Sequence, residues 1–266
     1  MLVALNGTAR IHAASAEKGP DFRCPGCGEA VILRKGTRVV HHFAHKAPVT
    51  CSWAVGETQG HLAGKNLLMD LFKWHGYEVD VEFPVGKQRA DVHVLGKRGR
   101  AHIFEIQHQP ITPAEISART KGYFAAGAAV TWISLIDIAK LGSKTTKTLT
   151  GYVIERYTPK PFERWLHGFH FKELWFFEPS TRMFWRGTFS ASIIHVPLSE
   201  WRTPGGGSAS AGGYSRTSRK WKTLTLDRPY PVNLISFGVE TRPASAIGDF
   251  SYPGGRRITM AGVMLT

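Results

Sequence analysis

Two acidic residues near the middle of the chain are the first candidates for chemistry. Asp91 lies in one short run of strand-like sequence and Glu105 in the next, and a basic, glycine-rich turn over residues 95–100 joins the two runs. Because side chains alternate across a strand, Glu105 and Gln107 share one face, and pairing of the runs would bring Asp91 beside Glu105. Two carboxylates that converge in a basic chain are best explained by a divalent cation. The sequence therefore predicts that Asp91 and Glu105 bind Mg²⁺ or Mn²⁺.

A helix predicted over residues 57–75 could bring further groups to this point. An apolar stripe marks the face that it would bury. On another face Glu57, His61 and Lys65 follow one another at intervals of four residues, so that they would line up. Such a row is usually a solvated helix face. Placed beside the two strand carboxylates, it would instead give the metal a third acidic ligand in Glu57 and bring a base, His61 or Lys65, into reach.

Three cysteines in the first fifth of the chain indicate a second metal site. Cys24 and Cys27 form a Cys-Pro-Gly-Cys knuckle, and His42, His45 and Cys51 compete for the remaining positions. Zinc takes four sulfur or nitrogen ligands in a tetrahedron, commonly two from such a turn and two from a distant segment. A closed site of this kind would be structural. The alternative is a set of reduced, unliganded cysteines beside a histidine cluster.

The segments around these residues predict an α/β core with a mixed sheet. The order is a helix, three strands, a helix and a strand, with a βαβ crossover between residues 104 and 132. Thr112 to Glu115 matches a capping box, which marks the start of the second helix. The predicted elements are hairpins at 2–13 and 30–41, strands at 77–83, 89–95 and 101–107, a helix at 112–124 and a strand at 128–135.

Beyond residue 140 the sequence predicts short aromatic strands and one further helix. The stretch at 203–218 is rich in glycine and serine and is expected to be a flexible loop or linker. Lys220, Trp221 and Lys222 follow it as a basic patch with an aromatic ring that could stack on a base. Solvated charges beside a core tryptophan are the alternative. The predicted elements here are strands at 149–157, 174–177, 183–189 and 193–196 and a helix at 161–167.

The composition points to an acidic partner. With 34 Lys and Arg against 20 Asp and Glu the formal charge is +14, which favours nucleic acid over a merely basic surface. The charge is +7 on each side of residue 150, which argues against a basic tail. The start of the chain has no secretory pattern, and the most apolar stretch, 123–139, is too short and interrupted to cross a membrane. The three cysteines suit a reducing compartment, and we expect a cytoplasmic protein without membrane contact.

Taken together, these residues resemble the CoiA-like competence proteins, whose core belongs to the PD-(D/E)xK, or restriction-endonuclease-like, nuclease superfamily. The resemblance covers about the first half of the chain and depends on the order and spacing of short motifs. The motifs are Met1–Leu5, Cys24-Pro-Gly-Cys27, His42-Phe-Ala-His45, Glu57 with His61 and Lys65, Arg89-Ala-Asp91, Glu105-Ile-Gln107, Arg119-Thr120 with Tyr123, and Trp132-Ile133.

The resemblance implies a zinc-ribbon-like module at residues 1–55, a nuclease-like core at 56–145 and a β-rich C-terminal region at 146–266. It also implies a metal-dependent nuclease that processes or recombines DNA during natural transformation, with DNA and recombination proteins as partners. Arg119, Lys220, Trp221 and Lys222 are then the candidate nucleic-acid contacts.

One position departs from the superfamily pattern, because Gln107 stands where a lysine is usual. Glutamine can orient a water but cannot take its proton near neutral pH. That task would fall to metal-bound hydroxide, or to Lys65 or His61 with a lowered pKa. The second hypothesis is therefore a DNA-binding or recombination-assisting protein that keeps the nuclease fold without its activity.

Overall fold

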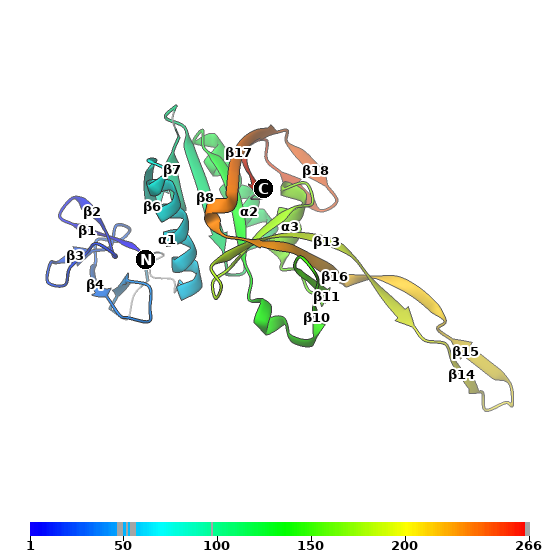
Figure 1. The fold of residues 1–266 in the computed structure, drawn as a ribbon. Coiled ribbons are helices and arrows are strands. Elements are labelled where there is room, and N and C mark those ends of the chain that lie inside the picture. Colours follow the sequence, from blue (N-terminus) through cyan, green and yellow to red (C-terminus); the bar gives the residue numbers. More distant parts are fainter. Residues whose placement is uncertain (47–49, 52, 54–56, 97, 264–266) are drawn as a thin grey trace.

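The computed structural model describes residues 1–46, 50–51, 53, 57–96 and 98–263. A small β module at the start of the chain lies beside the first long helix, and a larger body is built on one extended sheet (Figure 1). A narrow two-stranded arm projects from that body on the side away from the β module. Within the described residues, no helix has the length and apolar character needed to cross a membrane.

The N-terminal module is a five-stranded sheet with the order β2-β1-β3-β4-β5. The predicted first hairpin is confirmed, with Asn6 paired to Ala9 around a two-residue turn. The second hairpin is shifted: the partner of β4 is not residues 38–41 but the strand that begins at His42. The strands are β1 (Val3–Asn6), β2 (Ala9–His12), β3 (Phe22–Arg23), β4 (Ala30–Arg34) and β5 (His42–His45).

The body contains the predicted mixed sheet. Strands β6, β7 and β8 form an antiparallel meander, and β9 then pairs parallel to β8 after the crossover through α2. The whole sheet has eleven strands, and it continues across residue 145 into the C-terminal region. The elements of this part are α1 (Gln59–Trp74), β6 (Glu78–Val85), β7 (Gln88–Leu95), β8 (Ala101–Gln107), α2 (Pro113–Ala125) and β9 (Ala129–Leu135).

Helices α1 and α2 each begin directly after a threonine that caps them. Thr58 caps α1 by accepting a hydrogen bond from the backbone N–H of His61, so Glu57 precedes the helix instead of belonging to it. Thr112 and Glu115 form the predicted capping box of α2. Helix α1 lies close against the sheet because it has a glycine at position 64, where a Cβ atom would stand 2.7 Å from the Cδ1 atom of Ile106.

The C-terminal region extends the sheet and adds the arm. The strands expected at 183–189 and 193–196 are one continuous strand, β13, which pairs with β16 over most of its length. The further elements are η2 (Ile138–Lys144), β10 (Thr145–Lys147), β11 (Tyr152–Tyr157), α3 (Pro161–Phe169), β12 (Leu174–Glu178), β13 (Met183–Val196), β14 (Ser199–Arg202), β15 (Ser208–Ala211), β16 (Tyr214–Tyr230), η3 (Val232–Leu234), β17 (Ile235–Arg242), β18 (Ser245–Ile247), β19 (Phe250–Tyr252) and β20 (Gly255–Gly262).

The stretch at 203–218 is not the flexible linker that its composition predicts. Its residues form β15 and the first part of β16, and each of these strands has a partner. Glycine and serine have low strand propensity, but cross-strand hydrogen bonds fix them once a neighbouring strand is supplied. That neighbour lies in the preceding segment of the chain, where composition alone does not show it.

Candidate active site

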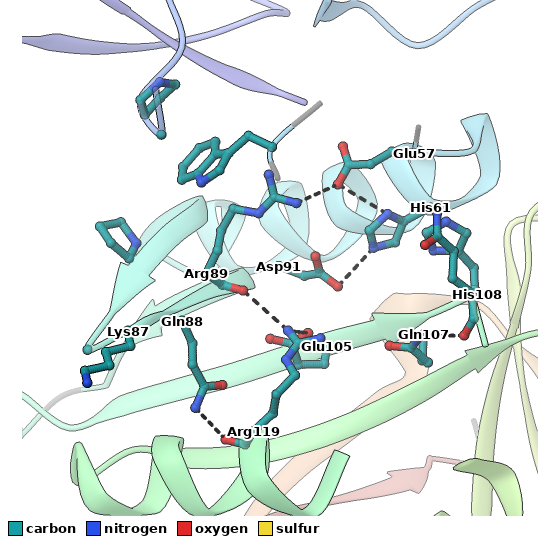
Figure 2. Close-up of a pocket in the computed structure, with 16 residues that line it drawn as sticks. Glu57, His61, Lys87, Gln88, Arg89, Asp91, Glu105, Gln107, His108 and Arg119 are labelled. Atoms are coloured by element: carbon teal, nitrogen blue, oxygen red, sulfur yellow. Dashed lines mark hydrogen bonds and ion pairs between the residues drawn. The ribbon is translucent and has the colours of Figure 1, made fainter. Parts of the chain in front are cut away.

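A cavity of about 630 Å³ lies between the N-terminal module and the body. Its walls come from the middle of the Cys-Pro-Gly-Cys knuckle with Trp53, the start of α1, the turn between β6 and β7, the strands β7 and β8 with the segment after β8, and Arg119 of α2. Figure 2 shows the side chains that line it. All the predicted catalytic residues except Lys65 line it. They are Glu57, His61, Asp91, Glu105 and Gln107, joined by Arg89 and His108.

Glu57, His61 and Asp91 form a compact group in this cavity. His61 Nε2 lies 2.9 Å from Asp91 Oδ2, and His61 Nδ1 lies 3.4 Å from Glu57 Oε1 (Figure 2). One potential ligand atom from each residue lies within 4.8 Å of the other two. His61 is only 5% exposed, and its Nδ1 has no hydrogen-bond partner within the described residues.

The charges of this group are set by Lys65. Its ammonium donates to Glu57 Oε1 at 2.6 Å and lies 3.9 Å from Asp91 Oδ1. Burial opposes charge on both carboxylates, yet Lys65 lowers the pKa of Glu57, and His61 with Lys65 lowers that of Asp91. Both carboxylates are therefore ionised at neutral pH. Two carboxylates and an imidazole nitrogen with no other partner fit a divalent cation.

Lys65 itself cannot be the base that the sequence suggested. It is fully buried, and although burial favours the neutral amine, the carboxylates of Glu82, Glu57 and Asp91 raise its pKa. The predicted lowered pKa of Lys65 is wrong because the sequence did not show how many carboxylates would surround it. Lys65 is thus a buried cation that pairs with Glu57 and Glu82.

Glu82 is a functional residue that sequence reasoning missed. Its carboxylate lies 2.7 Å from Lys65 Nζ and accepts hydrogen bonds from the backbone N–H groups of Leu2 and Val3 in the N-terminal module. The alternation along β6 would place Glu82 on the same face as the part-exposed Asp80. Its φ angle of +55° turns the side chain inward instead. Few non-glycine residues adopt this conformation, and the alternation of the strand sequence does not predict it.

Glu105 lies across the strands from Asp91 but has different interaction partners. Arg119 Nη2 donates to Glu105 Oε2 at 2.7 Å, and the hydroxyl of Tyr123 donates to Oε1. Burial raises the pKa of Glu105 to about 7, with the Asp91 charge adding to the rise and Arg119 opposing it. Arg119, predicted as a nucleic-acid contact, is thus engaged with Glu105 and also stacks over Trp132, with its Cζ 5.0 Å from the ring centre.

Gln107 and His108 close the far end of the group. The Gln107 amide donates to the carbonyl of Gln109 at 2.7 Å. His108 stacks on His61 with 4.4 Å between ring centres, and burial lowers its pKa to about 4. His108 was not among the predicted residues. It directly follows Gln107 at the end of β8, and this position in the sequence could have identified it as a candidate.

The knuckle cysteines gather with His45 and Cys51. Cys24 Sγ lies 3.8 Å from Cys51 Sγ, and Cys27 Sγ lies 3.3 Å from His45 Nε2. Two sulfur atoms bound to one tetrahedral zinc at about 2.3 Å would be about 3.8 Å apart, so three thiols and one imidazole here fit zinc. His42 is three residues from His45 on β5 and therefore points to the opposite face, where its Nδ1 lies 2.8 Å from the carbonyl oxygen of Val40.

The knuckle also shapes the cavity. Gly26 packs against the ring of Trp53 so closely that a Cβ atom would collide with it. The guanidinium of Arg89 lies over the same ring, with its Cζ 4.7 Å from the ring centre, and its Nη2 is 3.7 Å from Glu57 Oε1. Through these contacts the cysteine site determines one wall of the cavity that contains the carboxylates.

The predicted patch at Lys220, Trp221 and Lys222 is not in this cavity. It lies on β16 at the root of the arm. Trp221 is half-buried and has two cations near its ring, with Arg156 Cζ at 5.4 Å and Lys220 Nζ at 5.9 Å from the ring centre. A cation already covers a face of the ring that could stack on a base.

Comparisons with known proteins show the family of this chain. Residues 5–54 match the model of the competence protein CoiA N-terminal domain, and residues 57–193 match that of the CoiA nuclease-like domain. Competence protein CoiA of Bacillus subtilis (strain 168) is 30% identical over 117 residues, which are 42% of this chain and 31% of that protein. No solved structure matches the chain. The chain therefore belongs to the CoiA family of competence proteins, with an N-terminal domain followed by a nuclease-like domain.

Proposed function

We propose that this protein is a metal-dependent deoxyribonuclease that hydrolyses phosphodiester bonds during processing or recombination of DNA. In this proposal the body is a restriction-endonuclease-like core and the first module is zinc-ribbon-like. The observation that carries the proposal is the group of Glu57, His61 and Asp91 in a cavity whose walls also contain basic side chains. The nuclease-like family match and the net charge of +14 support it.

The residues divide into those that hold the metal and those that handle the substrate. Glu57, Asp91 and His61 would hold Mg²⁺ or Mn²⁺, which supplies charge neutralisation for the phosphoryl group under attack. An imidazole ligand favours a transition metal such as Mn²⁺ over Mg²⁺, which prefers an all-oxygen shell. Arg89 lines the same cavity and can contact a phosphate oxygen.

Gln107, His108 and Glu105 lie where an attacking water would be positioned. Gln107 can orient that water through its amide oxygen, because its nitrogen already donates to Gln109. Burial lowers the pKa of His108 to about 4, so that it is neutral at neutral pH and can accept a hydrogen bond from that water, although it is a weak base there. Glu105 has its pKa raised to about 7 by burial and can hold a proton or release it in the working range.

The test is cleavage of supercoiled plasmid with added Mg²⁺ or Mn²⁺. We expect nicking by the wild type, stronger with Mn²⁺, and its loss in Asp91→Asn and His61→Gln. Asp70→Asn and His75→Gln are matched controls, because both residues are exposed at the far end of the same helix. Equal cleavage by the wild type and Asp91→Asn would contradict the assigned site.

The second candidate function is DNA binding without cleavage, and the buried state of Lys65 favours it. Lys65, which the sequence offered in place of the usual cation beside the attacking water, is not among the described lining residues and is paired with Glu57 and Glu82. The lysine that does line the cavity, Lys87, lies in the turn between β6 and β7. Absence of cleavage by every variant, together with intact DNA binding, would establish this alternative. Binding of a labelled duplex in the same buffers separates the two outcomes.

A further inference from the structure

The arm is a part of the molecule that the cavity does not use. We define it as residues 191–222. Near its root, β13 and β16 lose their outer neighbours in the sheet. Strand β11 pairs with β16 only as far as Lys222, and β12 pairs with β13 only as far as Gly187. From the pair Ile193 and Thr217 outward the arm is a ribbon of two strands with no third layer, and it projects from the body (Figure 1). With about 15 residues along each side of the arm, its reach is on the order of 50 Å.

Both faces of this ribbon are open, and they carry apolar side chains. Ile193, Leu198, Trp201 and Tyr214 are each between 49% and 57% exposed. A two-stranded ribbon alone is of marginal stability in water, and exposed apolar groups on it add to the cost. A partner that covers the ribbon would remove that cost.

The positive charge of the arm indicates an acidic partner. Its five cations, Arg202, Arg216, Arg219, Lys220 and Lys222, face a single acid, Glu200. None of the five forms an ion pair with an acid within the described residues. A second copy of the arm would meet this one with like charge, whereas a phosphate backbone would be attracted to it.

The shape of the outer part suits a groove. Across the tip, Trp201 pairs with Ala209 and Arg202 with Ser208, so the large side chains of β14 stand opposite small ones on β15. This keeps the ribbon narrow at its end. The major groove of DNA is about 12 Å wide and admits a two-stranded β-ribbon.

We propose that the arm binds duplex DNA by laying its outer ribbon in the major groove, with Arg202 and Arg216 on phosphates and Trp201 and Tyr214 against the groove wall. This inference shares with the proposed function the assumption of a DNA partner, but it does not need the chain to cleave DNA. The nuclease-like match ends at residue 193, at the root of the arm, so binding here is a property of this chain beyond the matched domain.

Two variants of the full chain test the proposal. In the first, residues 197–213 are replaced by Asn-Gly, which closes a two-residue hairpin on the existing pair Val196 and Tyr214. The second is Arg202→Ala with Arg216→Ala, which leaves the ribbon intact. The matched control is Lys18→Ala with Lys144→Ala, which removes two exposed cations elsewhere.

Binding is measured by fluorescence anisotropy on a labelled duplex of about 30 base pairs and on one of its strands, without added Mg²⁺ or Mn²⁺. We expect duplex affinity to fall on the order of tenfold at 0.1 M salt in the double-arginine variant, and its salt slope to fall by about 2. The shortened arm should lose at least as much, single-strand affinity should change less, and the control should stay within about twofold of the wild type.

Several results would overturn the proposal. They are unchanged duplex affinity in both arm variants, an equal loss in the Lys18 and Lys144 control, an equal loss on single strands, or a change in sedimentation that shows the arm joining two copies while duplex affinity is kept. Cleavage is measured with Mg²⁺ or Mn²⁺ and arm-dependent binding without them, so a failure of the nuclease proposal and a failure of the arm proposal are distinguishable.

Discussion

At the scale of single residues, three carboxylates near the cavity have different charge states because they have different neighbours. Glu57 and Asp91 lie beside Lys65 and are ionised, whereas Glu105 is buried with Asp91 across from it. Arg119 offsets only part of the burial of Glu105. A site that contains both ionised and titrating carboxylates can hold a cation and also move a proton.

The raised pKa of Glu105 predicts a pH-dependent stability. Burial raises its folded-state pKa to about 7, so the folded protein holds a proton that the unfolded chain releases near its ordinary pKa. The resulting stabilisation is complete at low pH and is lost as the pH rises through about 7. We expect the melting temperature of the wild type, relative to Glu105→Gln, to fall between pH 5 and pH 8 in metal-free buffer.

The matched control for this measurement is Glu29→Gln, an exposed glutamate in the N-terminal module. Its difference from the wild type should stay constant over the same pH range. A constant difference for Glu105→Gln as well would show that burial does not shift this carboxyl. Thermal unfolding followed by circular dichroism is sufficient for the comparison.

At the scale of elements, α1 places His61 and Lys65 against β6, β7 and β8, and Glu57 lies just before its N-cap. The helix can do so because Gly64 faces the sheet: a Cβ atom there would stand 2.7 Å from Ile106 Cδ1 and 3.0 Å from Phe177 Cδ1. The short approach lets the side chains of α1 reach the carboxylates on the strands. The cost of a flexible residue inside the helix is about 1 kcal/mol.

Gly64→Ala should therefore reverse the usual effect of this substitution. In an exposed helix interior, alanine in place of glycine stabilises by about 1 kcal/mol. Here we expect a loss of about 1–3 kcal/mol, because the extra methyl overpacks the contact between helix and sheet. Urea unfolding gives the free energy. Gly205→Ala is the control, since nothing lies within 4 Å of the added atom, and a stabilised Gly64→Ala variant would contradict the close approach.

The order of elements in the core was accessible from the sequence, since periodicity and capping residues are local. The hairpin over residues 2–13, the capping box at Thr112 and the crossover from β8 to β9 are confirmed. Strand boundaries that depend on a distant partner were not accessible. The pairing of β4 with residues 42–45, the continuity of β13 and the ordered strands at 208–230 each depend on such a partner.

At the scale of the whole molecule, the first module and the body share one site. Glu82 receives N–H groups from Leu2 and Val3 of the module and lies against Lys65 of the body. The knuckle and Trp53 form a wall of the cavity on the other side. Loss of the cysteine site should thus affect more than the module that contains it.

His45→Ala and His42→Ala form a matched pair for this idea. They are changes of the same kind three residues apart on β5, but only His45 joins the three cysteines. We expect metal analysis to find about one zinc per chain in the wild type and in His42→Ala, and much less in His45→Ala. Duplex binding should weaken with the loss of zinc, because the wall formed by Pro25, Gly26 and Trp53 is then no longer held.

Zinc retained by His45→Ala and lost by His42→Ala would reverse the assignment of the fourth ligand. Equal loss in both variants would mean that the module needs both histidines for folding. Circular dichroism of the two proteins separates that case from a simple loss of one ligand.

The sequence by itself determined the types and spacing of the candidate site residues. Strand alternation, helix periodicity and the knuckle depend only on residues that are close together in the chain. The sequence predicted that Asp91, Glu105 and Glu57 lie near one another, and it named five candidates for the cysteine site, of which the structure gathers four. Only the tertiary structure decided how these groups are charged and which of them meet. Charge on Lys65 and Glu105 depends on burial and on partners far away in the chain, and the side on which a strand residue lies depends on which strand it pairs with.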